Sequence, residues 1–160
     1  MSSATENATA GFLVWRLSMK WRVAVDRAVA PLGLTHAQYA LMASLYGMRR
    51  SGSKPSQRGL ADHTGLEALY VSKLARALEA SGLVARTRDP NDPRAMQLSL
   101  TEQGLDVTRR AIAVVQGLLD QLLEPLGGQN SARTRQFTRE LATLLDAPLD
   151  PHTENETEQS

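Results

Sequence analysis

The chain has 160 residues, a formal net charge of +1 and no cysteine, which suits one domain with a real core and excludes disulfides and thiol-based sensing. No apolar run approaches the roughly 20 residues of a membrane span, and residues 1–11 lack the regions of a secretory signal. We therefore expect a cytoplasmic protein without membrane contact.

The charge is distributed unevenly along the chain. Residues 49–110 carry eleven basic and seven acidic side chains, whereas residues 111–160 carry three and eight. A local basic excess is the electrostatic footprint of a nucleic-acid contact, although a solvated face can carry the same excess. Its coincidence with the motif described below favours the nucleic-acid contact.

The N-terminal part predicts two helices after a short polar segment. Residues 1–9 have little to bury and are expected to be disordered. Residues 10–30 predict a long helix whose apolar side chains cover more than one stripe, which indicates burial from several sides and a partner subunit. Pro31 ends this helix, and the sequence Thr-His-Ala-Gln from Thr35 is a capping box for a helix that runs to about Met48.

The basic region opens with a predicted helix-turn-helix. Ser56 is the expected N-cap of a short helix over residues 57–63, and Thr64 and Gly65 then form a tight turn. Residues 66–82 predict a second helix with one apolar stripe at i, i+3, i+4 and i+7 spacing. The opposite stripe of this helix consists of Leu69, Ser72, Lys73 and Arg76. Such a face can enter the major groove of DNA.

A short hairpin is predicted after this helix. Residues 83–88 and 96–100 predict strands, joined by a turn over residues 89–94 that is rich in proline and Asx residues. Together with the two preceding helices, the hairpin predicts a winged helix-turn-helix.

Two acidic residues of the hairpin turn, Asp89 and Asp92, resemble a pair of catalytic carboxylates. Because Arg88 and Arg94 flank them, we expect ion pairs that orient the wing instead.

The C-terminal part predicts further helices over residues 102–126, capped by Thr101, and 133–145. A winged head of this size cannot cover their apolar surface and that of the first helix, so we expect a homodimer. The predicted organisation is a single α+β, mostly α domain with dimerisation helices at 10–34 and 102–146, a winged helix-turn-helix at 35–101 and a disordered acidic tail at 147–160.

Several short motifs resemble the MarR family of transcriptional regulators. They are Gly-Leu-Thr at 33–35, Leu-Ala at 60–61, Val-Ser-Lys-Leu at 71–74, Gly-Leu-Val at 82–84, Asp-x-Arg at 92–94 and Leu-Thr-Glu-x-Gly at 100–104. The last two motifs together are fairly specific to the family, and the resemblance covers about residues 10–146. The chain departs from the family pattern at Tyr70, where a small hydroxyl residue is usual, and at Gly59, which interrupts the first helix of the motif.

The resemblance implies a ligand-responsive repressor that binds a pseudo-palindromic operator in double-stranded DNA as a homodimer. The expected DNA contacts are Ser56, Ala68, Leu69, Tyr70, Ser72, Lys73, Arg76, Arg86, Arg88, Asn91, Asp92 and Arg94. The alternative is a winged-helix module for protein contacts or nucleoid architecture, which would lack a sharp specificity ratio over random DNA.

The family usually binds small aromatic or anionic effectors between the helical base and the winged head. The candidate effector contacts are Trp15, Met19, His36, Tyr39 and Met42, with the alternative that they are interface and core residues. No metal site is expected, because the histidines lack helical pairing and have no cysteine partner. No phosphate-binding glycine loop or nucleophile elbow is present, so we expect neither a cofactor nor an enzyme.

Overall fold

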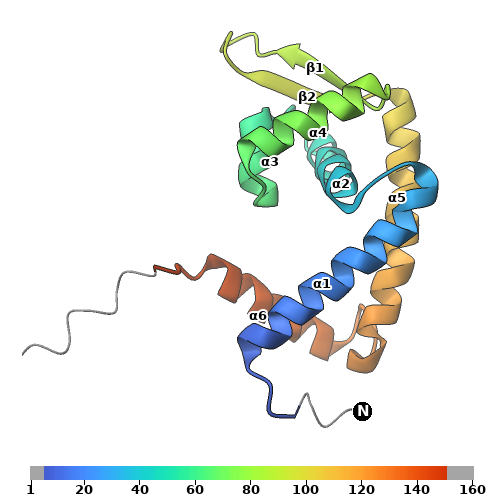
Figure 1. The fold of residues 1–160 in the computed structure, drawn as a ribbon, viewed down its shortest axis with the longest axis vertical. Helices are drawn as coiled ribbons and strands as arrows, with labels where there is room; N and C mark the ends of the chain where they lie inside the picture. Colours follow the sequence, from blue (N-terminus) through green and yellow to red (C-terminus); the bar gives the residue numbers. More distant parts are fainter. Residues whose placement is uncertain (1–5, 151–160) are drawn as a thin grey trace, which may run out of the picture. The chain divides into compact units, whose positions relative to one another are not determined.

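A computed structural model of the chain describes residues 6–150 (Figure 1). In chain order the elements are α1 (Ala10–Val29), η1 (Ala30–Leu32), α2 (His36–Arg50), α3 (Gln57–Thr64), α4 (Ala68–Ala80), β1 (Val84–Arg88), β2 (Met96–Leu100), α5 (Glu102–Leu123), η2 (Glu124–Leu126) and α6 (Ala132–Asp146). The mostly helical α+β winged fold is confirmed. No helix among the described residues is long and apolar enough to cross a membrane.

The chain forms two compact units, Met1–Leu118 and Leu119–Ser160. The single domain expected over residues 10–146 stays a prediction. Most of the two segments that were expected to be disordered, 1–9 and 147–160, lies outside the described residues.

Two helices end before their predicted limits, each at a 3-10 turn that contains proline. α1 ends at Val29, and Pro31 lies in the following η1. α5 ends at Leu123, and Pro125 lies in η2. Proline cannot continue the i to i−4 hydrogen bonds of an α-helix because it lacks a backbone N–H. Each helix therefore ends in a short 3-10 turn.

The helix-turn-helix consists of α3 and α4. The predicted interruption at Gly59 is wrong: α3 is continuous, and the Gly59 backbone N–H donates to Oγ of Ser56 at 3.0 Å as part of the N-cap. α3 ends because Gly65 adopts a left-handed φ of 74°. α4 begins two residues later than predicted because Glu67 is extended, with φ −67° and ψ 143°.

The apolar stripe of α4 packs into the hydrophobic core of the first unit, as predicted. The buried members of this stripe are Val71, Leu74, Ala75 and Leu78. They join buried residues of α1, α2, α3 and both strands, including Val25, Leu41, Leu60, Val84 and Leu98. This packing holds α4 by one side and leaves its opposite side free.

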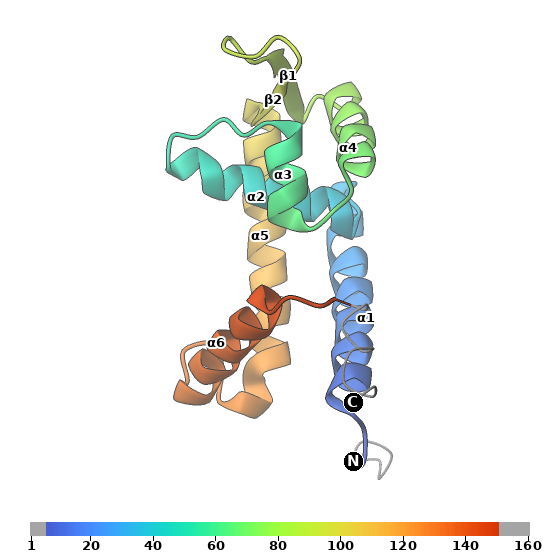
Figure 2. The same ribbon diagram turned by 90° about the vertical axis from the view of Figure 1, so that its left-hand side faces the viewer.

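The wing is the antiparallel pair β1 and β2, with Val84 opposite Leu100 and Arg88 opposite Met96. Figures 1 and 2 show this hairpin at the end of the winged head, beside α3 and α4. Ser56 forms an isolated antiparallel bridge with Gln97 of β2. The wing is therefore joined through backbone pairing to the residue that caps α3.

The start of α5 is fastened to the end of α4 by the Leu-Thr-Glu-x-Gly segment. Oγ1 of Thr101 donates to the Gly82 carbonyl at 2.6 Å and accepts the Gly104 backbone N–H at 3.0 Å. A Cβ on Gly104 would lie 1.9 Å from the carbonyl oxygen of Leu83. Glycine is required at this position because the two backbones touch.

Candidate nucleic-acid interface

α4 presents the predicted polar stripe to solvent. Leu69 is 85% exposed, Lys73 and Arg76 are exposed, and Ser72 is half-buried. Within residues 6–150, neither Lys73 nor Arg76 has an ion-pair or hydrogen-bond partner through its side chain. Both cationic groups are therefore available to an anionic partner.

The predicted ion pairs of the wing turn are wrong. Oδ1 of Asp89 accepts the backbone N–H of Asn91 at 2.8 Å, and Oδ1 of Asp92 accepts the backbone N–H of Arg94 at 3.0 Å. Neither carboxylate forms an ion pair with an arginine of the described chain. Both acids instead form Asx turns, which shape the backbone of the wing. Within residues 6–150 the Arg94 guanidinium has no carboxylate partner.

The wing and the two helices enclose a hollow of about 580 Å³, which we call the wing hollow. Its lining comes from the start of α3, the start of α4 and the wing, and consists of Ser56, Gln57, Arg58, Ala68, Asp92, Arg94, Ala95 and Met96. It brings together four of the predicted DNA contacts, Ser56, Ala68, Asp92 and Arg94. The N-terminus of α3 adds its free backbone N–H groups and positive dipole end, which suit a phosphate.

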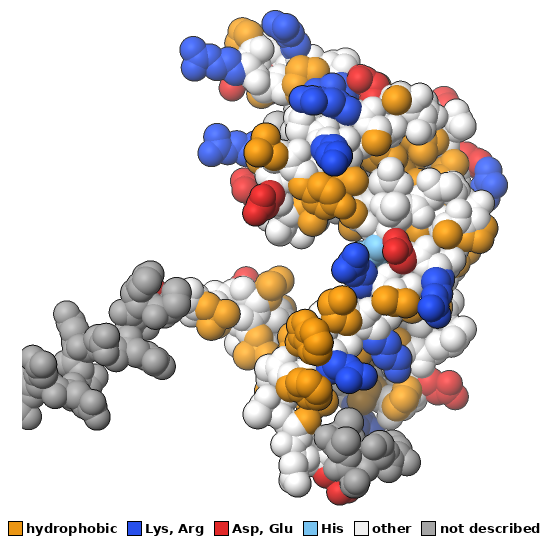
Figure 3. Space-filling model, in the orientation of Figure 1, with side chains coloured by type: hydrophobic (Ala, Val, Ile, Leu, Met, Phe, Trp, Pro, Cys, Tyr) orange, Lys and Arg blue, Asp and Glu red, His pale blue; other side chains and the backbone are white. Residues whose placement is uncertain are grey.

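Arg86 lies apart from the exposed DNA-contact candidates. Its side chain is 17% exposed and pairs with Glu79 of α4 at 3.6 Å. Its Nε also donates to Oε1 of Gln57 at 3.0 Å. Arg86 therefore ties β1 to α3 and α4, whereas Arg88 and Asn91 are exposed on the wing. Figure 3 shows basic side chains on the wing and on the head beside it.

The five candidate effector contacts do not meet in one place. Met42 is fully buried in the core, and Tyr39 is half-buried against it, so the core alternative holds for these two. Trp15 is 58% exposed on α1, where its ring lies 6.2 Å from that of Phe12. Met19 lines a groove on α1, and His36 lies in a hollow formed by several helices.

That second hollow, which we call the α1–α4 hollow, has a volume of about 520 Å³. It is lined by Arg22 and Asp26 of α1, by Thr35, His36, Ala37 and Ala40 at the start of α2, and by Thr64, Leu66 and Tyr70 around the start of α4. Burial lowers the pKa of His36 below its usual 6.5; the nearby Asp26 carboxylate opposes this shift and the Arg22 guanidinium adds to it.

The sequence interpretation missed the residues that hold these sites together. Asp26 accepts the backbone N–H of His36 through Oδ1 at 2.7 Å, and Gln57 and Glu79 hold Arg86. Asp26 and His36 are 10 residues apart in the sequence, and Gln57 and Arg86 are 29 residues apart. Local sequence periodicity cannot predict contacts at such separations. No group of three or more His, Asp or Glu side chains in residues 6–150 is placed to hold a metal ion.

Comparisons with known proteins agree on one family. A family model described as MarR family matches residues 32–95. The HTH-type transcriptional regulator YdcH of Bacillus subtilis (strain 168) is 34% identical over 110 residues, which cover 69% of this chain and 75% of that protein. The HTH-type transcriptional repressor Rv2887 of Mycobacterium tuberculosis (strain ATCC 25618 / H37Rv) is 29% identical over 141 residues, 87% of this chain and 95% of that protein.

A solved structure gives the same fold. CouR from Rhodococcus jostii RHA1, crystallised with p-coumaroyl-CoA, is 26% identical with a TM-score of 0.74, and the match covers 94% of this chain and 99% of that one.

Proposed function

The chain belongs to the MarR family of DNA-binding transcription regulators, and we propose that it is a ligand-responsive repressor that binds a pseudo-palindromic operator as a homodimer. The observation that carries the DNA-binding part of this proposal is the wing hollow, where the start of α3, the start of α4 and Arg94 of the wing converge beside the exposed face of α4. Repression is favoured by the relative Rv2887, which is named a transcriptional repressor.

On DNA, α4 enters the major groove with Leu69, Lys73 and Arg76 toward the bases or phosphates. A backbone phosphate lies in the wing hollow between the N-terminus of α3 and the guanidinium of Arg58 or Arg94. The wing then reaches the adjacent minor groove. A long, planar and permanently charged arginine is suited to a narrow A/T-rich minor groove, where negative potential is concentrated.

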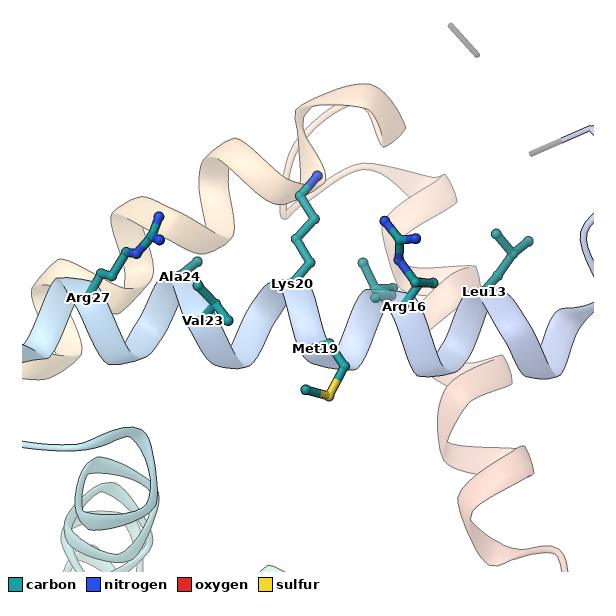
Figure 4. A pocket seen from close by; sticks show the side chains of 8 residues that line it. Leu13, Arg16, Met19, Lys20, Val23, Ala24 and Arg27 are labelled. Atoms are coloured by element: carbon teal, nitrogen blue, oxygen red, sulfur yellow. The ribbon is translucent and has the colours of Figure 1, made fainter. Parts of the chain in front are cut away.

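Exposed apolar side chains support the homodimer. On α1 the large ones are Phe12, Leu13, Val14, Trp15, Leu17, Met19 and Val23, each at least 37% exposed. Four of them, Leu13, Leu17, Met19 and Val23, line a groove of about 710 Å³ along α1. In this groove Arg16, Lys20 and Arg27 point to one side and Met19 to the other (Figure 4). In the second unit, Leu141, Leu144 and Leu145 of α6 are also exposed. Monomers rarely expose apolar patches of this kind, whereas a two-fold axis would bury each patch against its copy.

The α1–α4 hollow is the best place for an effector. It offers the Arg22 guanidinium and the His36 imidazole to an acidic group, and Ala37, Ala40 and Leu66 to an apolar body. The relative CouR was crystallised with p-coumaroyl-CoA, an aromatic acyl thioester, which supports an aromatic or anionic ligand class.

Selection of bound fragments from a random DNA pool tests the DNA-binding proposal and yields the operator. We expect enriched fragments to share a two-fold pattern with half-sites about one helical turn apart, and to bind about 10³-fold or more tightly than random DNA. An architectural module would bind selected and random fragments with equal affinity. Loss of transcription from a promoter that contains the selected site, in the presence of the protein, then separates repression from activation.

A further inference from the structure

We propose that Leu69 reads the C5-methyl group of a pyrimidine base in the major groove. Each half-site then carries a position at which the protein selects thymine, and at which 5-methylcytosine is preferred to cytosine. This inference rests on the proposal that α4 enters the major groove, and it deepens that proposal by naming a chemical group that α4 recognises there.

Leu69 is the most exposed large apolar side chain in the described part of the first unit. It is 85% exposed, whereas the next, Trp15, is 58% exposed. Trp15 belongs to a patch of exposed apolar side chains along α1, but Leu69 shares its side of α4 with Ser72, Lys73 and Arg76. Single exposed leucines are common on protein surfaces, so the role of Leu69 follows from its place on α4 and not from its exposure alone.

That place is the end of the helix that meets base edges in this kind of motif. α4 begins at Ala68, so Leu69 is the second residue of its first turn. In a helix-turn-helix the N-terminal residues of the recognition helix contact the base edges. At about 100° per residue, Leu69 points roughly 180° away from Leu78, which is fully buried in the core. Leu69 therefore points outward from the DNA-facing side of α4.

The wing hollow lies beside this first turn. Ala68, the neighbour of Leu69 in the chain, lines the hollow together with Arg58 and Arg94. Phosphate contacts position a recognition helix, and base contacts supply its sequence choice. A backbone phosphate held by the two arginines would therefore anchor the first turn of α4 at the groove and present Leu69 to the base edges.

The chemistry of Leu69 limits what it can read. Its side chain has no hydrogen-bond donor or acceptor, so it cannot pair with the polar groups of a base. The major groove displays the C5-methyl group of thymine, and 5-methylcytosine carries a methyl group on the same carbon. Contact with Leu69 removes this methyl group from water, and the burial of one such group is worth about fourfold in affinity.

Deoxyuridine tests this contact, because it is thymidine without the C5-methyl group and keeps the same hydrogen-bonding groups. Each thymine of the selected DNA is replaced in turn, in one half-site or in both, and the affinity is measured at a fixed salt concentration. With the wild type, at least one replacement should weaken binding by about fourfold in one half-site. Replacement in both half-sites should weaken it by about 16-fold, since free energies add at separate positions.

Leu69→Asn assigns the methyl contact to this side chain. Asparagine has nearly the shape of leucine but replaces its apolar end by an amide. At the sensitive position this variant should bind thymine and deoxyuridine sites with equal affinity. Leu149→Asn is the matched control, because Leu149 is 96% exposed and follows the end of α6, and it should keep the wild-type sensitivity. Both variants should keep the wild-type melting temperature, since both leucines are exposed.

Methylated DNA distinguishes the methyl group from thymine as a whole. The sensitive T·A pairs are changed to C·G pairs that contain either cytosine or 5-methylcytosine. The wild type should bind the methylated DNA about fourfold more tightly per half-site, and Leu69→Asn should bind both forms equally. Equal binding of the two forms by the wild type would contradict recognition of the methyl group itself.

The remaining outcomes separate this inference from the proposal on which it rests. If no deoxyuridine replacement changes the affinity of the wild type, or if Leu69→Asn keeps the full sensitivity, Leu69 does not read a methyl group. Enrichment of a two-fold site would still support a sequence-specific regulator in that case. If no sequence is enriched from the random pool, sequence-specific binding is overturned and this inference with it.

Discussion

The side chain of Arg86 donates from Nε to Oε1 of Gln57 at 3.0 Å, which joins the first strand of the wing to the first turn of α3. Arg86→Met keeps the length of the side chain and removes this bond and the pairing with Glu79. We expect the free energy of unfolding to fall by about 1–2 kcal/mol, as for a partly buried charged hydrogen bond, measured by urea denaturation.

The same variant separates positioning from contact. Because Arg86 neutralises no phosphate in our account, Arg86→Met should leave the salt dependence of DNA binding unchanged. Arg88→Met is the matched control two residues along the same strand, where the side chain is exposed. Arg88→Met should leave the free energy of unfolding unchanged. If Arg86→Met and Arg88→Met had equal free energies of unfolding, the role of Arg86 would be contradicted.

Gly104 is expected to tolerate no side chain. Gly104→Ala places a methyl group against the carbonyl oxygen of Leu83, 1.9 Å away, so the start of α5 must move from the end of the winged head. We expect a loss of about 3 kcal/mol or more in unfolding free energy, or failure to fold. Gly47→Ala in α2 is the control, because its Cβ meets nothing within 4 Å and alanine favours the helix by up to about 1 kcal/mol. Similar melting temperatures for the two variants would contradict the close contact.

His36 gives the fold a pH dependence of defined sign. Its folded pKa lies below the usual 6.5, mainly because the imidazole is partly buried. The unfolded chain therefore takes up a proton at higher pH than the folded protein, and stability falls as pH decreases through 6.5 toward the folded pKa. Urea midpoints between about pH 8 and pH 5 should show a smaller decrease for His36→Gln than for the wild type. His63→Gln, at an exposed position of α3, should retain the wild-type decrease; an unchanged pH profile for His36→Gln would contradict the assignment.

The exposed apolar face of α1 is expected to form the dimer interface. Trp15→Glu should raise the dimer dissociation constant by about 10²-fold, because burial of an unpaired carboxylate costs several kcal/mol, and sedimentation equilibrium measures the change. Leu69→Glu is the matched control, since it also converts an exposed apolar residue to an acid, but on the DNA-facing side of α4. It should remain dimeric and lose DNA binding. A wild type that sediments as a monomer at micromolar concentration would contradict the homodimer.

Local pattern predicted most of the fold. The i, i+3, i+4 and i+7 spacing from Val71 to Leu78 identified the buried face of α4, and the alternation from Met96 to Leu100 identified a strand. Helix limits were missed where Glu67 is extended, because a single residue before a helix carries no periodic signal.

Side-chain partners were predicted less well, for physical reasons. Charge alone does not predict the partner of Asp92, because its short side chain can also accept the backbone N–H two residues ahead. It does so here and forms an Asx turn with Arg94 instead of an ion pair. Met42 was proposed as an effector contact because an apolar helix residue fits either a core or a pocket, and burial alone decides between them. The lining of the α1–α4 hollow comes from segments distant in sequence, so only the folded chain brings Arg22 and Tyr70 together.

The contact of the wing with DNA can be measured through Arg94. The measurement is a salt titration of binding to the selected DNA, with A/T or G/C pairs under the wing, for the wild type, Arg94→Ala and the control Arg139→Ala on α6. Arg94→Ala should keep the wild-type melting temperature, bind DNA roughly tenfold or more weakly and lose the preference for A/T pairs. The slope of log affinity against log salt concentration should fall by about one, since one cation near the phosphates is removed. Arg139→Ala should match the wild type. Equal affinities of the wild type and Arg94→Ala at every salt concentration would contradict the account.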